Sequence, residues 1–140
     1  MIVGFTGTRF GMNYFQYGAV SALLGLPDIT EFRHGCCQGS DEQAHKIADY
    51  YDIPIIGHPP DKTDFTSKQY LNYKALRTPK PYLERNHDIV DASDTMIATP
   101  KENEEVLRSG TWATIRYAKK TNTFLYLVLP IGRVEVYANT

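Results

Sequence analysis

The chain has 140 residues, of which 42% are hydrophobic and 22% are charged, and its 15 Lys and Arg against 16 Asp and Glu give a net charge of −1. This length predicts one domain, residues 1–140, with a core large enough to need no disulfide. The composition excludes a disordered, collagen-like or coiled-coil chain. The near-zero charge argues against binding along a nucleic-acid backbone, so we expect no nucleic-acid partner.

The two cysteines, Cys36 and Cys37, are adjacent in the chain. Neighbouring cysteines cannot form an unstrained structural disulfide, and two thiols without a further CxxC pair make a poor zinc site. We therefore expect neither a metal nor a cofactor, and a reducing, cytoplasmic location. No stretch approaches the ~20 apolar residues of a membrane span, and the N-terminus lacks the features of a signal peptide.

In its first half, the chain alternates short apolar runs with helical periods. Strands are predicted at 2–5, 31–34 and 53–57, and helices at 13–24 and 40–51. In the second of these helices, Ala44, Ile47, Ala48 and Tyr51 recur at i, i+3, i+4 and i+7, the pattern of an amphipathic helix. Ser40 stands where an N-cap residue is preferred.

Residues 58–80 break this rhythm, because they are rich in proline, lysine and tyrosine and have no sustained apolar period. A loop this long in a compact domain predicts a lid or a binding loop, and we expect a short helix around 70–73 within it. Beyond it, helices are predicted at 81–92 and 111–120, and strands at 94–98, 124–129 and, at an edge, 134–137. In the first of these helices we expect Leu83 and Val90 to face the sheet.

Strands that alternate with amphipathic helices predict an α/β fold, a three-layer α/β/α arrangement around a mainly parallel sheet of five to six strands. Ligands of such sheets bind beyond the carboxyl ends of the strands. The segments that follow the predicted strands are therefore the candidates for a binding site.

Three of these segments combine glycine, a hydroxyl and a charged side chain. They contain Gly7, Thr8 and Arg9; His34, Gly35, Gly39, Ser40 and Asp41; and Arg108, Ser109, Gly110 and Thr111. Such turns allow close backbone approach and, at a helix start, free N–H groups for an anion, while arginine offers a fork for phosphate. Their convergence on one side of one sheet predicts a phosphate-type binding site.

Each turn taken alone also has a plain structural explanation. Arg9 fits a tight turn with a solvated side chain, and Asp41 suits the first turn of any helix. His34 is either a ligand contact or a core histidine bonded to backbone. Arg85 and Asn86, near the start of helix 81–92, lie either at the edge of the site or on solvated surface.

These residues, together with Gly4, Phe5, Glu84 and Asp94, resemble the SLOG superfamily over residues 2–130. That group joins the Lonely Guy (LOG) nucleotide hydrolases, the DNA-processing-protein-A Rossmann domains and small stand-alone nucleotide-binding proteins of bacteria and phages. The resemblance implies a Rossmann-like fold and a nucleotide-derived ligand, such as a nucleoside monophosphate or an ADP-ribose relative. It also implies a homo-oligomer in which a partner chain completes the pocket.

The sequence departs from the LOG motif PGGxGTxxE. Glu84 and Arg85 match the catalytic ER pair of LOG enzymes, and Gly110-Thr111 match the Gly-Thr, but Thr114 stands at the position of the catalytic Glu. The double glycine is replaced by a charged insertion that contains Glu104 and Glu105. Cleavage of an N-glycosidic bond needs a carboxylate, so we expect binding rather than catalysis.

Three functions follow from these observations. The first is a binder of a nucleotide-derived molecule, acting as a sensor or by sequestration, for example a phage protein that removes an immune signal. The second is a nucleoside 5′-monophosphate phosphoribohydrolase that uses Arg85 and Glu84. The third is a DNA- or protein-interaction module, in which the tyrosine-rich segment 58–80 stacks on bases.

Overall fold

A computed structural model describes residues 1–138, in which strands and helices alternate along most of the chain. The strands are β1 (Ile2–Gly7), β2 (Glu31–His34), β3 (Ile55–Gly57), β4 (Ala75–Leu76), β5 (Thr95–Thr99), β6 (Phe124–Leu129) and β7 (Arg133–Tyr137). The helices are α1 (Tyr14–Leu24), α2 (Ser40–Tyr50), α3 (Tyr82–Ala92) and α4 (Gly110–Lys120).

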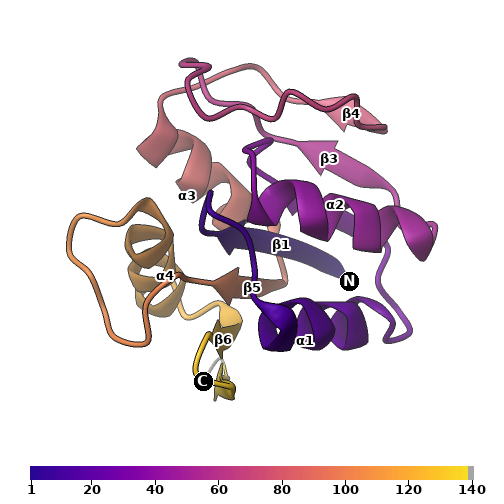
Figure 1. Ribbon diagram of the computed structural model, residues 1–140. Coiled ribbons are helices and arrows are strands. Elements are labelled where there is room, and N and C mark those ends of the chain that lie inside the picture. The colour runs from indigo at the N-terminus through magenta and orange to yellow at the C-terminus, as the bar shows by residue number, and fades with distance from the viewer. Residues whose placement is uncertain (139–140) are drawn as a thin grey trace.

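The strands form one sheet in the order β4-β3-β2-β1-β5-β6-β7, which is parallel throughout except for β7, antiparallel to β6. Helices α1 and α2 pack on one face, and α3 and α4 on the other (Figure 1). The expected three-layer α/β fold is confirmed. The C-terminal strand joins the sheet at an edge as predicted, and the sheet has seven strands rather than five or six because part of segment 58–80 pairs with β3 as β4.

The core lies in two layers, one on each side of the sheet. On the α1 and α2 side, Phe5 and Phe32 pack with their ring centroids 6.0 Å apart. On the α3 and α4 side, Ile89, Met96 and Leu125 are among the buried residues. All five residues of β5 are buried, as expected for a central parallel strand that is covered on both faces.

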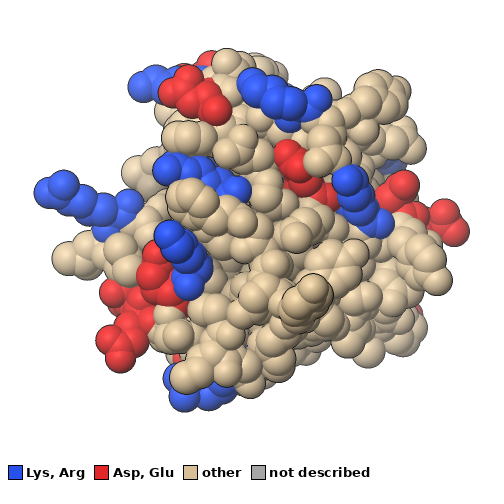
Figure 2. All heavy atoms as spheres, in the orientation of Figure 1, with Lys and Arg blue, Asp and Glu red and all other residues tan. Residues whose placement is uncertain are grey.

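The first helix is unusual in that no Asp, Glu, Lys or Arg occurs between residues 10 and 27. Figure 2 shows the corresponding uncharged surface over α1. Asn13 and Gln16 form a capping box at its start. The buried Gln16 amide also donates to the carbonyls of Pro100 (2.8 Å) and Val128 (3.0 Å), which ties α1 to the ends of β5 and β6.

Three local predictions were wrong. The segment around Tyr70 forms no helix, since residues 70–73 have no regular secondary structure and β4 follows at Ala75. Leu83 is 57% exposed, and the face of α3 that is buried carries Arg85, Ile89 and Val90 instead. Ser40 is the first residue of α2 rather than its cap, because the preceding glycine occupies the cap position.

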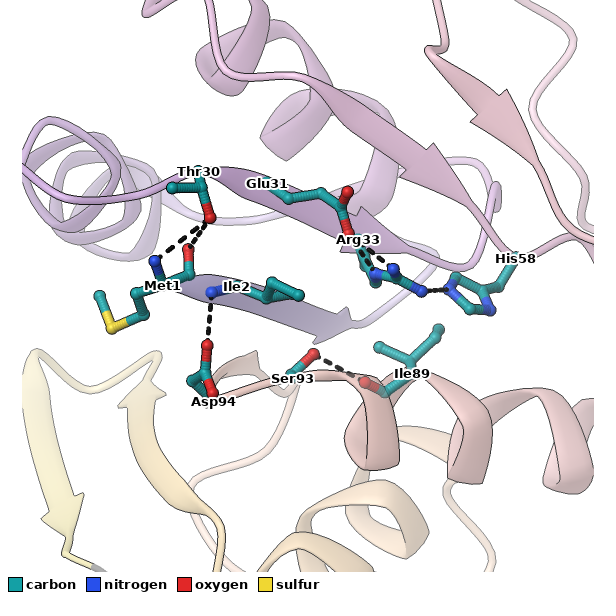
Figure 3. A network of polar contacts seen from close by, with 9 residues as sticks. All are labelled: Met1, Ile2, Thr30, Glu31, Arg33, His58, Ile89, Ser93 and Asp94. Carbon is teal, nitrogen blue, oxygen red and sulfur yellow. Dashed lines mark hydrogen bonds and ion pairs between the residues drawn. The ribbon is translucent and has the colours of Figure 1, made fainter.

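Polar contacts join neighbouring segments at the amino edge of the sheet and around β2 (Figure 3). The Asp94 carboxylate accepts from the backbone N–H of Ile2 at 2.7 Å, which joins the starts of β5 and β1. Arg33 pairs with Glu31 at 2.6 Å and lies 3.3 Å from the His58 ring nitrogen. Asp94, one of the residues that carry the SLOG resemblance, thus has a structural role at the edge opposite the carboxyl ends of the strands.

Within residues 1–138, no helix is both long enough and apolar enough to cross a membrane.

Burial in the second core layer predicts a large effect of truncating Leu125, whose side chain is fully buried. Leu125→Ala should lower the free energy of unfolding by about 2–5 kcal/mol, because it removes buried methyl groups and leaves a cavity. Leu107→Ala is the control, since Leu107 is 80% exposed, and its effect should stay within about 0.5 kcal/mol. Urea denaturation measures both, and equal effects would contradict the assigned core.

Candidate functional site

A cavity of about 480 Å³ lies at the carboxyl edge of the sheet, a volume that suits a small organic ligand. In Figure 1 this is the side toward which β1 points, where α3 begins and the loop 100–109 projects. The predicted site residues on its wall are Gly7, Thr8, Arg9, Gly35, Asp41, Arg85, Asn86, Arg108, Ser109, Gly110 and Thr111. The structure therefore brings parts of all three turns together, while ligand binding by these residues stays a prediction.

Arg85 forms the inner wall of this cavity and is only 6% exposed. Its guanidinium donates to the backbone carbonyls of Gly35 and His58 and, through Nε, to Asn86 Oδ1 at 2.8 Å. A side chain at position 35 would collide with this guanidinium, so glycine is required there. Arg85 Nη2 also donates to Cys37 Sγ at 3.9 Å, so four of its N–H donors are used within the protein. Arg85 thus joins the ends of β2 and β3 to the start of α3.

Asp41 lies beside Arg85 and is also buried. Its Oδ2 accepts from the backbone N–H of Cys37 at 3.1 Å. Burial raises the pKa of the Asp41 carboxyl to about 6, although the nearby Arg85 and the Cys37 N–H lower it. Burial, with a smaller contribution from Asp41, also raises the pKa of the Cys37 thiol to about 11, so this cysteine is not an activated nucleophile.

The start of α2 is used within the protein and is not an open anion cradle. The Ser40 N–H and hydroxyl both donate to the carbonyl of Thr8, at 3.1 and 2.6 Å, and Ser40 is fully buried. Gly39 has a positive φ of 80°, and a Cβ there would collide with the carbonyl oxygen of Arg9. Gly39 and Ser40 therefore lock the turn after β1 onto α2, and neither lines the cavity.

His34 is a core histidine and does not line the cavity. Its Nδ1 accepts from the Cys36 N–H at 3.0 Å, so its Nε2 carries the proton that is directed at His45 Nδ1, 2.8 Å away. The ring of Tyr73 packs against both imidazoles. Burial, followed by the charges of His45 and Arg85, holds the pKa of His34 well below its usual range.

The start of α4 is open to the cavity, in contrast to that of α2. The Ser109 hydroxyl caps the helix by accepting from the Trp112 N–H at 3.2 Å. Within residues 1–138, the N–H groups of Gly110 and Thr111 have no hydrogen-bond acceptor, and nothing lies within 4 Å of a Cβ built on Gly110. These free donors and the helix dipole favour an anion, next to the exposed Arg108.

Several wall residues were missed by the sequence analysis, namely Phe10, Cys37, Phe65, Tyr82, Lys101 and Glu102. Arg9 lies between the rings of Phe65 (3.9 Å) and Phe10 (4.9 Å), and Lys101 Nζ lies 4.4 Å from the Phe10 ring centroid. Lys101 and Glu102 follow the strand that ends at Thr99, so their position after a strand was a usable signal. Phe65 carried no such signal, because only the folded segment 58–80 brings it to the cavity.

Glu84, the catalytic candidate of the sequence, and the two acids of the insertion, Glu104 and Glu105, do not line the cavity. Glu84 is on the exposed side of α3, 3.8 Å from Lys80, and Glu105 pairs with Arg116 at 2.7 Å. Thr114 is buried and donates its hydroxyl proton to the Gly110 carbonyl at 3.0 Å. Two other carboxyl groups, Asp41 and Glu102, line the cavity instead.

Among the described residues, no group of three His, Cys, Asp or Glu side chains could hold a metal ion.

Known proteins share this fold. No protein-family model matches the chain, and no curated protein sequence is significantly similar to it. The molybdenum cofactor binding protein from the phototrophic bacterium Rippkaea orientalis is 24% identical with a TM-score of 0.65, over 91% of this chain and 76% of that one. The DNA processing protein A from Streptococcus pneumoniae has a TM-score of 0.67 at 17% identity, over 89% of this chain and 49% of that one.

The DNA processing protein A from Helicobacter pylori, described with a single-stranded DNA binding mode, has a TM-score of 0.61 at 21% identity, over 91% of this chain and 64% of that one. Likeness at these identities shows the fold alone. The chain therefore shares the Rossmann-like α/β fold of these proteins, which is the fold that the sequence resemblance implies.

The buried position of Arg85 predicts a structural cost of removing its guanidinium. Arg85→Met should lower the free energy of unfolding by about 2–4 kcal/mol, because the carbonyls of Gly35 and His58 lose their donor. Arg108→Met is the matched control, since the exposed Arg108 should change stability by less than about 0.5 kcal/mol. If urea denaturation gave the same small change for both variants, the anchoring role of Arg85 would be wrong.

The raised pKa of Asp41 predicts a pH-dependent stability. Between pH about 4 and about 6 the folded state holds more protons at Asp41 than the unfolded state, so its contribution to the free energy of unfolding falls as pH rises. Relative to Asp41→Asn, which does not titrate, the wild type should lose on the order of 2 kcal/mol across this window. Parallel pH profiles of the two proteins in urea denaturation would refute this assignment.

Proposed function

We propose that this chain binds a nucleotide-derived small molecule in the cavity at the carboxyl edge of the sheet, as a sensor or by sequestering it. The observation that carries the proposal is the open start of α4, flanked by Arg9, Lys101 and Arg108 on the same cavity wall. None of these three cations lies within 4.0 Å of a carboxylate in the described part of the chain. They are free to neutralise a phosphate.

The aromatic residues of the wall support a flat group attached to this anion. Phe10, Phe65 and Tyr82 contribute ring surface from three different segments. Aromatic faces of this kind stack on any nucleobase, so they support a nucleotide-derived ligand without indicating which base it carries. Segment 58–80 supplies Phe65 and is fastened by backbone bonds from Gln38 to Phe65 and from Ser67 to Cys36. We propose that this segment acts as the lid of the cavity.

Binding without reaction is favoured over hydrolysis because Thr114, at the LOG catalytic position, points into its own helix. The alternative, a nucleoside 5′-monophosphate phosphoribohydrolase, is supported by a specific feature: Asp41 and Glu102 place carboxyl groups on the cavity wall. The Glu84 side chain, by contrast, lies outside the cavity. Release of free base from a bound nucleotide would decide for this alternative.

A DNA-interaction module is the weaker alternative, although a fold neighbour is described with single-stranded DNA. The net charge of −1 provides no general attraction for a polyanion. The proposal also does not take its ligand from the molybdenum cofactor binding protein, because 24% identity shows a shared fold alone. The homo-oligomer that the resemblance implies stays part of the proposal, and light scattering would test it.

Calorimetric titration with AMP, GMP, CMP, UMP and ADP-ribose tests the proposal. At least one should bind, and Arg108→Met should weaken its affinity by about 10- to 100-fold, because a charge-assisted phosphate contact is lost. Arg133→Met, on the exposed edge strand β7, is the matched control and should leave the affinity unchanged. Absence of binding by all five compounds at high micromolar concentration would overturn the proposal.

A further inference from the structure

The wall of the cavity holds unpaired charges of both signs. Arg9, Lys101 and Arg108 provide the positive charge, and Glu102 lies on the same wall, directly after Lys101 in the chain. Figure 2 shows basic and acidic side chains side by side over the region of loop 100–109. Yet no ion pair within 4.0 Å includes Glu102 among the residues that the structure describes.

Glu102 is held by a neutral donor instead. Its Oε1 accepts from the Trp112 indole N–H at 3.0 Å, and Trp112 is only 4% exposed in the first turn of α4. Because the core fixes this indole, it also fixes the carboxylate near the helix start. Lys101 does not compete for it, since its ammonium lies over the ring of Phe10. Within residues 1–138, Oε2 of Glu102 has no hydrogen-bond partner.

A carboxylate accepts hydrogen bonds and cannot donate them, so the free oxygen calls for a donor from the ligand. That donor should be neutral, because Arg9, Lys101 and Arg108 on the same wall would repel a second cation. It should also lie close to the phosphate, since Glu102 is bonded to the first turn of α4, where the anion is proposed to bind. In a nucleotide, the neutral donors nearest to the phosphate are the hydroxyls of the sugar.

Resting on the proposed function, we infer that Glu102 accepts hydrogen bonds from the sugar hydroxyls of the ligand and thereby selects ribonucleotides over their 2′,3′-dideoxy counterparts. The cations and the start of α4 bind the phosphate, and Glu102 binds the sugar hydroxyls. A ligand that carries a phosphate and sugar hydroxyls pairs with the cations of the wall and also donates hydrogen bonds to Glu102. One that lacks the hydroxyls leaves the carboxylate unpaired in the complex, which costs affinity.

The test compares each of AMP, GMP, CMP and UMP with its 2′,3′-dideoxy form by calorimetry. For the ribonucleotide that binds, the wild type should prefer it over the dideoxy form by at least about tenfold. Glu102→Gln can keep the bond from Trp112 but loses the charge, so the preference should fall to about threefold or less. Glu102→Ala should abolish it. Glu104→Gln, an exposed acid of the same loop that does not line the cavity, should leave it unchanged.

Lys101→Met tests the phosphate end of the ligand separately from the sugar. It should lower the affinity for the ribonucleotide and for its dideoxy form by the same factor, so the ratio of the two affinities should not change. Equal affinity of the wild type for the two forms would overturn the inference on Glu102 while leaving nucleotide binding intact. The same holds if Glu102→Ala weakened both forms without changing their ratio. If neither the four ribonucleotides nor ADP-ribose bound to the wild type, the proposed function would fail first, and the inference with it.

Discussion

The guanidinium of Arg85 is the interaction on which the carboxyl edge of this sheet depends. The loops after β2 and β3 begin with the carbonyl groups of Gly35 and His58, which would be buried without a donor, and one planar cation with several N–H groups satisfies both. The chain leaves a glycine at position 35 so that the guanidinium fits, and places Asp41 beside it. The inner wall of the cavity is therefore held together by hydrogen bonds within the protein.

This use of Arg85 divides the charged groups of the cavity into two sets. The inner groups, Arg85 and Asp41, hold the loops together, whereas Arg9, Lys101 and Arg108 make no ion pair in the described chain. A protein of net charge −1 thereby concentrates positive potential at one place without being basic as a whole. The same division applies to the two helix starts, since α2 is closed by internal bonds and α4 is open.

Sequence reasoning was most successful where a single periodicity decides the structure. The boundaries of β6 agree with the apolar run at 124–129, because a strand that is covered on both faces must be apolar on both. The boundaries of β2 agree with the strand predicted at 31–34, although its sequence, EFRH, is mostly polar. Sequence reasoning failed where contacts between residues distant in the chain decide the local structure. The two residues of β4 form a strand only because they pair with β3. In α3, Arg85 is buried because it bonds to the distant Gly35 and His58 carbonyls, whereas Leu83 is exposed.

By itself, the sequence determined the α/β fold, the carboxyl-edge location of the candidate residues and the absence of a carboxylate at position 114, since these follow from chain order, period and residue type. Only the tertiary structure decided which of the candidates face the cavity. Glycine, serine and arginine in a turn serve an anion or the protein itself, depending on which groups the fold places against them. Ser40 donates to the Thr8 carbonyl, and Arg85 donates to two loop carbonyls. Glu102 accepts from one indole N–H, and its second carboxylate oxygen has no partner in the described chain.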